Sequence, residues 1–139
     1  MLNIKRALQF SVFFYIALFV EYIVLIFLLG QNFYLPESLW FFLLFWIFLV
    51  PVTLLLSKWY FRTDTPTAKK GFLLGLLALV VACLIDILLF TFFIDPATRS
   101  EMISYVAGDW RFYIHPIEIL ILTAYAGYEF DSTFTKPIL

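Results

Sequence analysis

Five ionisable side chains interrupt the apolar stretches of this 139-residue chain: Glu21, Asp86, Arg111, His115 and Glu118. A charged side chain at the centre of a bilayer costs roughly 2.5–3.5 kcal/mol on insertion scales. Ionisable groups inside apolar segments are therefore functional candidates with partners to be found. Carboxyl groups combined with an imidazole and a guanidinium suit the binding of a proton or a cation.

The composition places these groups in a membrane protein. Hydrophobic residues make up 64% of the chain and charged residues only 14%, whereas soluble domains are about 45–50% apolar and about 25% charged. The net charge of −1 offers no basic surface, which excludes nucleic acid as a partner. A single cysteine, Cys83, excludes an internal disulfide.

The apolar stretches are long enough to cross a bilayer four times. The predicted spans are about 8–29, 37–57, 69–94 and 111–129. Asp95-Pro96 is typical of a helix start and Gly108 of a helix end, which predicts a short interfacial helix between the third and fourth spans. Short connections favour an all-α, up-down-up-down four-helix bundle, so residues 1–139 form a single transmembrane domain.

The positive charges predict the orientation of the bundle. Lysines and arginines at one predicted side are Lys5, Arg6, Lys58, Arg62, Lys69, Lys70 and Lys136, against Arg99 and Arg111 at the other. By the positive-inside rule, both termini are cytoplasmic.

With this orientation, the depth of each acid follows from its place in its span. Glu21 and Asp86 each precede the outer end of their helix by about 8 residues, or roughly 12 Å at 1.5 Å per residue. On the fourth span, His115 is then roughly 6 Å deep and Glu118 roughly 10 Å deep. Acids from three helices are expected to converge beneath the outer leaflet.

Arg111, His115 and Glu118 are spaced to share one face of the fourth span. Three carboxylates in a low-dielectric slab cannot all be ionised cheaply. Arg111 and a protonated His115 would offset two of them, which leaves one to hold a proton or attract a cation.

A structural interpretation stands beside the functional one. Glu118 with Arg111 or His115 could be an ion pair that fixes the register of the fourth span. Glu21 and Asp86 could share a proton as a contact between helices. The two interpretations carry about equal weight, since architecture alone says little about activity.

Small residues lead up to Asp86 at helical spacing and are expected to pack against a neighbouring helix. They are Gly71, Gly75, Ala78 and Ala82. This face could form a dimer contact or a contact within the chain. The second is favoured, because the same face leads to Asp86.

The sequence favours a protein that is not an enzyme, because it has none of the common catalytic motifs. The chain has no G-x-S-x-G, no Walker A, no HExxH and no dinucleotide fingerprint, so we expect no cofactor. One histidine and three carboxylates could ligate a divalent metal ion, but no ligand spacing requires one.

The run from Lys70, K-G-xxx-G followed by Asp86 and a phenylalanine, resembles small uncharacterised bacterial inner-membrane proteins with four predicted helices. Tyr105, Trp110 and Pro116 fit the same pattern loosely. The resemblance covers the C-terminal half. It implies a bacterial cytoplasmic membrane and supplies no activity.

Three functions follow, in order of preference. The first is a small polytopic membrane protein, structural or an accessory subunit, whose partners are the lipid bilayer and other membrane subunits or further copies of itself. The second is a proton- or cation-coupled transport component that uses the buried acids and His115. The third is a metal-binding membrane enzyme.

Overall fold

The computed structural model describes residues 2–134, and the side chains of residues 2–130. The described chain is all-α. Its five helices are α1 (Ile4–Leu29), α2 (Leu39–Phe61), α3 (Ala68–Phe93), α4 (Pro96–Gly108) and α5 (Arg111–Phe134). The part of the predicted C-terminal tail from residue 135 onward, including Lys136, lies outside the described residues.

Three of these helices, α1, α2 and α3, are long and apolar enough to cross a membrane. They make the chain an integral membrane protein. The fourth predicted span also forms a helix, α5. Among the described residues, α5 is not apolar enough to count as a membrane span by the length and hydropathy that identify the other three. Polar residues such as His115 and Glu118 lower its mean hydropathy.

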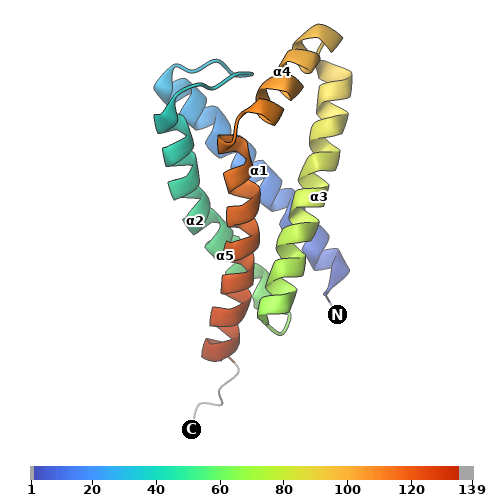
Figure 1. Cartoon of the computed structure of the whole chain (residues 1–139). Helices are drawn as coiled ribbons and strands as arrows, with labels where there is room; N and C mark the ends of the chain where they lie inside the picture. The colour runs from blue at the N-terminus through green and yellow to red at the C-terminus, as the bar shows by residue number, and fades with distance from the viewer. Residues whose placement is uncertain (1, 135–139) are drawn as a thin grey trace.

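The four long helices form a ring in which α1 packs on α2 and α3, and α5 packs on the same two helices from the opposite side. Figure 1 shows successive long helices running in alternating directions, with α4 capping the end between α3 and α5. The N-terminus and the described end of α5 lie at the same end of the bundle (Figure 1). We call this the N-terminal end, and the other the α4 end.

Capping residues explain where the helices begin and end. The Asn3 side chain accepts a hydrogen bond from the Arg6 backbone N–H at 3.2 Å, so α1 begins earlier than residue 8. Gly30 ends α1 with φ of 59°, a left-handed conformation that favours glycine. The helix α2 begins after Ser38 and not at residue 37, because Pro36 and Glu37 remain in the preceding loop.

The short helix predicted after Asp95 is α4. The carboxylate of Asp95 accepts hydrogen bonds from the backbone N–H groups of Ala97 and Thr98 at 3.1 and 3.0 Å. Pro96 occupies the first turn, where it needs no amide partner. Gly108 is the last residue of the helix, as the sequence predicts.

Two apolar clusters fill the interior of the ring. One is centred on Phe10, Phe14, Leu49, Tyr60, Leu74 and Ile119, and therefore draws on all four long helices. The second comprises Leu25, Ile26, Phe41, Phe42 and Phe45, and holds α1 against α2. Large apolar side chains also cover the outside of the bundle, as expected where lipid replaces water.

Candidate functional site

Asp86 is tied to α1 by Tyr15, a residue that the sequence pattern did not single out. The Tyr15 hydroxyl donates a hydrogen bond to Oδ1 of Asp86 at 2.6 Å, and both residues are half-buried. This bond joins α1 to α3 and gives the carboxyl group a partner of its own. A tyrosine in the middle of an apolar span was the signal that could have revealed it, because its hydroxyl also needs a partner.

Arg111 does not offset the buried acids, contrary to the sequence prediction. Its guanidinium pairs with Asp109 through Nε at 2.9 Å. It also donates to the backbone carbonyl of Glu37 at 2.7 Å and lies over the Phe42 ring, 4.3 Å from the centroid. Arg111 therefore holds the start of α5 against the start of α2. Its side-chain hydrogen bond lowers the pKa of Asp109.

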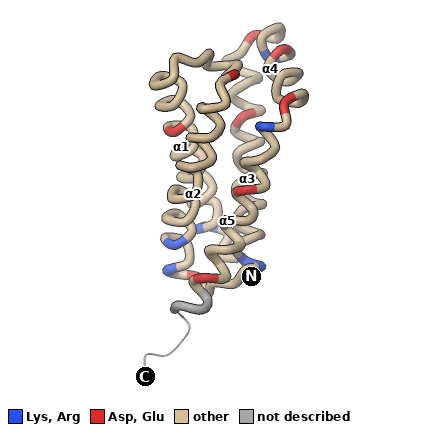
Figure 2. The backbone as a smooth tube through the Cα atoms, turned by 60° about the vertical axis from the view of Figure 1, so that its left-hand side comes forward, with Lys and Arg blue, Asp and Glu red and all other residues tan. Residues whose placement is uncertain are grey.

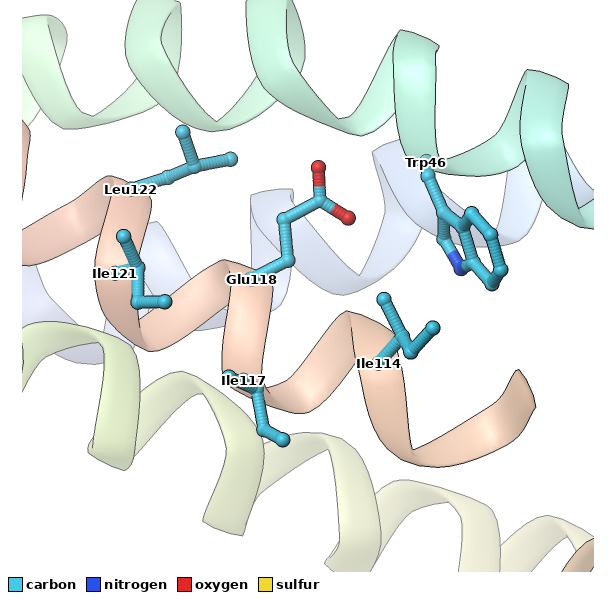
Figure 3. A pocket seen from close by; sticks show the side chains of 6 residues that line it. All are labelled: Trp46, Ile114, Ile117, Glu118, Ile121 and Leu122. Carbon is cyan, nitrogen blue, oxygen red and sulfur yellow. The ribbon is translucent and has the colours of Figure 1, made fainter. Parts of the chain in front are cut away.

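Glu21 and Glu118 remain together once Asp86 and Arg111 are assigned elsewhere. The charge of Glu118 on α5 reaches the carboxyl group of Glu21 on α1. Figure 3 shows the Glu118 side chain rising from α5 toward α2, between Leu122 and Trp46. We call Glu21 and Glu118 the carboxyl pair.

The carboxyl pair has buried oxygens that find no hydrogen-bond partner in the described structure. Both carboxyl oxygens of Glu21 and Oε2 of Glu118 are in this state. A buried polar atom without a partner costs about 1–3 kcal/mol, so such atoms call for an explanation. Like charges also repel in a low-dielectric interior, which favours a proton or a cation at the pair.

His115 lies one helical turn before Glu118 on α5 and is packed between aromatic rings. The centroid of its ring is 5.3 Å from that of Phe45 and 6.4 Å from that of Phe112. Its Nδ1 is buried and has no partner among the described residues. His115 is thus near the carboxyl pair along the helix, but its described ring contacts are apolar.

Grooves open on both sides of α2 beside the carboxyl pair. One, of about 420 Å³, lies between α2 and α5 and is lined by Trp46, Ile114, Ile117, Glu118, Ile121 and Leu122 (Figure 3). The other, of about 350 Å³, lies between α1 and α2, with Glu21, Phe48 and Val52 on its wall. Both linings are almost wholly apolar, so they suit lipid chains rather than water.

The convergence predicted from depth is therefore only partial. Within the described residues, no group of three or more His, Cys, Asp and Glu side chains is placed to hold a metal ion. The predicted cluster of Glu21, Asp86, Glu118 and His115 with Arg111 reduces to one pair of acids. Equal depth along separate helices did not bring all the side chains together, because depth fixes the level of a residue and not its direction.

The glycines of α3 meet α5 at very short range. A Cβ at Gly71 would collide with the backbone carbonyl of Thr123, and a Cβ at Gly75 would collide with its side chain. Gly127 on α5 leaves the same room for the backbone of Thr67. Ala78 is buried in the core, whereas Ala82 is half-buried. These small residues let α3 and α5 approach within one chain.

Hydroxyl groups inside the bundle fall into two classes that the sequence does not distinguish. Ser11 and Thr123 each donate to the backbone carbonyl four residues earlier, at 2.8 Å. Thr53 and Ser57 on α2 are fully buried, at 0% exposure, yet their hydroxyl oxygens have no partner among the described residues. Only the structure separates the two classes.

At the N-terminal end, Asp64 joins three parts of the chain. Its carboxylate accepts hydrogen bonds from the Tyr60 hydroxyl at 2.7 Å, the Lys70 ammonium at 2.6 Å and the Asn3 backbone N–H at 3.2 Å. Burial acts to raise the pKa of Asp64, but the bonds from Lys70, Tyr60 and Asn3 outweigh it and hold that pKa below 3.8. Asp64 is therefore a charged carboxylate with hydrogen-bond donors around it, whereas the carboxyl pair has buried oxygens without a partner among the described residues.

No protein-family model, no curated protein and no solved structure matches this chain. The resemblance of its C-terminal half to small four-helix bacterial membrane proteins gains no support from these comparisons. The function has to be inferred from the contacts of its own residues.

Proposed function

We propose that the chain is one four-span transmembrane domain with both termini in the cytoplasm. Figure 2 supports this orientation, because most Lys and Arg positions lie at the N-terminal end of the bundle. The 24 residues of α5 would reach about 36 Å as a helix, which exceeds the apolar thickness of a bilayer. A bacterial cytoplasmic membrane as the location rests on the resemblance alone.

Cysteine labelling tests the fourth span. In a Cys83→Ala background, Glu101→Cys on α4 and Tyr128→Cys near the end of α5 are both exposed positions. A membrane-impermeant thiol reagent should label them from opposite sides of sealed vesicles. Labelling of both from the same side would contradict a membrane-spanning α5.

Within this bundle, the carboxyl pair supports a proton- or cation-coupled transport component as the function. The observation that carries the proposal is that both carboxyl oxygens of Glu21 and Oε2 of Glu118 are buried without a hydrogen-bond partner among the described residues, with Glu118 in electrostatic range of Glu21. Ionisable residues inside a membrane are functional candidates by default when nothing structural uses them. A shared proton or a small cation between the two carboxyl groups would satisfy both.

The role of structural or accessory subunit explains a different set of residues. It accounts for Asp86 and Arg111, which have their own partners, and for the glycines between α3 and α5. It gives no use to the carboxyl pair. We therefore keep it as the competing outcome of the transport experiment.

The experiment is an ion-flux assay in proteoliposomes that contain the purified chain and a trapped dye that is sensitive to pH, to sodium or to potassium. Under an imposed gradient, the wild type should move protons, or sodium or potassium ions, faster than protein-free vesicles. Glu21→Gln and Glu118→Gln should each reduce this flux about tenfold or more, because each removes one of two coupled acids.

The matched control is Asp86→Asn, which alters a buried acid that already has a partner. It should retain flux in proportion to its folded fraction. A wild type that moves no ion above the protein-free background would overturn the transport function and leave the accessory subunit.

A further inference from the structure

The groove of about 420 Å³ between α2 and α5 combines an apolar wall with a single carboxyl group. Apart from Glu118, it is lined by Trp46 of α2 and by four aliphatic side chains of α5, among them Ile117 and Ile121. These two isoleucines are also exposed on the outside of the bundle. The groove, which we call the α2–α5 groove, is therefore open to molecules dissolved in the lipid.

Glu118 is the member of the carboxyl pair that is accessible from a groove. Both carboxyl oxygens of Glu21 are buried without a partner, whereas only Oε2 of Glu118 is in this state. Figure 3 shows the Glu118 carboxyl group in the space between Leu122 and Trp46. A ligand in the α2–α5 groove can therefore reach this carboxyl group directly.

No basic side chain among the described residues pairs with Glu118. On its own helix, Arg111 pairs with Asp109, and His115 packs against aromatic rings. From α1, Glu21 adds a second acid and not a positive charge.

The other two long helices supply no counter-charge either. Residues 39–57 of α2 include no ionisable side chain, and the acid of α3, Asp86, is bonded to Tyr15. A carboxylate in apolar surroundings is unfavourable without a positive partner. The positive charge that complements the α2–α5 groove therefore has to come from a ligand.

The apolar wall determines what kind of cation fits. A divalent metal ion takes about six oxygen ligands, and no group of three or more His, Cys, Asp and Glu side chains in the described chain is placed to hold one. A bulky organic cation instead needs apolar contacts and one counter-charge. Trp46 suits such a ligand, because an indole ring attracts a cation more strongly than any other aromatic side chain.

We propose that the α2–α5 groove binds a lipophilic organic cation, such as a quaternary ammonium or phosphonium ion, against Glu118 in place of a proton. As the cation binds, the O–H bond of the carboxylic acid breaks, its electron pair stays on the carboxylate, and the proton leaves to water. One positive charge replaces another, so the charge at the site is conserved. The site rests on the proposed transport function and names the class of cation that is exchanged for a proton.

The test is equilibrium dialysis of the detergent-purified chain with radiolabelled tetraphenylphosphonium, with protein-free micelles as the blank. Wild-type protein should bind the ion saturably, and more tightly as the pH rises, because protons compete for the same carboxyl group. Tetraphenylborate has nearly the same shape and the opposite charge. It should show no saturable binding.

Four variants assign the binding to the α2–α5 groove. Glu118→Gln should weaken binding about tenfold or more and remove its pH dependence. Glu118→Asp keeps the charge and should retain most of the affinity. Trp46→Leu should weaken binding about threefold through loss of the indole. Asp86→Asn, the control, should leave affinity per folded molecule unchanged.

Binding and flux together separate this site from the transport function. No saturable binding of tetraphenylphosphonium, or binding that survives Glu118→Gln, would overturn the site. The transport function would stand in either case if Glu118→Gln still reduced ion flux. Binding that is lost in Glu118→Gln, in a wild type that moves no ion, would retain the site and overturn transport.

Discussion

Two regions of the bundle handle buried polar groups in opposite ways. The α3 seam, where α3 meets α1 and α5, gives its polar groups partners: Asp86 bonds to Tyr15, and Thr123 bonds to its own backbone beside Gly71 and Gly75. Around α2, buried oxygens of the carboxyl pair and the hydroxyls of Thr53 and Ser57 have no partners among the described residues.

Polar groups with partners and polar groups without partners are expected to differ in their effect on stability. A polar group in lipid that is bonded to another helix stabilises the bundle, by an average of about 0.6 kcal/mol and at most about 1.7 kcal/mol. A polar group without a partner contributes nothing of this kind. The α3 seam therefore holds the helices together, and the region around α2 is where we propose binding and transfer.

The largest expected effect is at the closest approach in the α3 seam. Gly71→Ala would place a methyl group against the Thr123 backbone, which cannot move aside as a side chain can. We expect the free energy of unfolding in detergent to fall by about 3 kcal/mol. Gly108→Ala is the control, because a Cβ at that position would meet no atom within 4 Å and the change should matter little. Equal stability of the two variants would contradict the account of the seam.

The bond between Asp86 and Tyr15 should appear as a coupling energy. A double-mutant cycle with Asp86→Asn and Tyr15→Phe should give a coupling of about 1 kcal/mol in the free energy of unfolding. The same cycle applied to Asp86 and Glu118 should give a coupling near zero. A large coupling energy between Asp86 and Glu118 would show that these two acids interact, as the sequence predicted.

At the N-terminal end, Asp64 predicts a loss of stability in acid. Its folded pKa is lowered from the ordinary value of 3.8, so its contribution is complete above that value and is lost as the pH falls through the lower folded pKa. Unfolding measured between neutral pH and strong acid should therefore be less pH-dependent in Asp64→Asn than in the wild type. Identical acid profiles would show that the bonds to Lys70 and Tyr60 do not stabilise the fold.

The smallest expected change in stability is at Thr53 on α2. Thr53→Val removes a hydroxyl that has no partner in the described chain, so the free energy of unfolding should change by less than about 1 kcal/mol. Thermal unfolding of the purified variant is sufficient to measure it. A loss of several kcal/mol would mean that Thr53 has a structural partner, and would remove the contrast with the α3 seam.

The class of protein and most helices follow from the sequence, because length, hydropathy and caps such as Asp95 and Gly30 act locally. The partners of the ionisable groups do not follow. Arg111 lies on a favourable helical face for Glu118, yet Asp109, two residues away, holds it instead. The direction of a side chain around its helix depends on how the helices are rotated, which no single span specifies.

The central claim is that the acids around α2 are needed for ion flux, whereas the contacts in the α3 seam stabilise the fold. The most direct measurement is proton flux in proteoliposomes for Glu21→Gln and Asp86→Asn, with the free energy of unfolding measured on the same preparations. We expect Glu21→Gln to lose flux and keep its stability, and Asp86→Asn to lose stability and keep its flux per folded molecule. The reverse pattern, or equal loss of both properties in both variants, would contradict the claim.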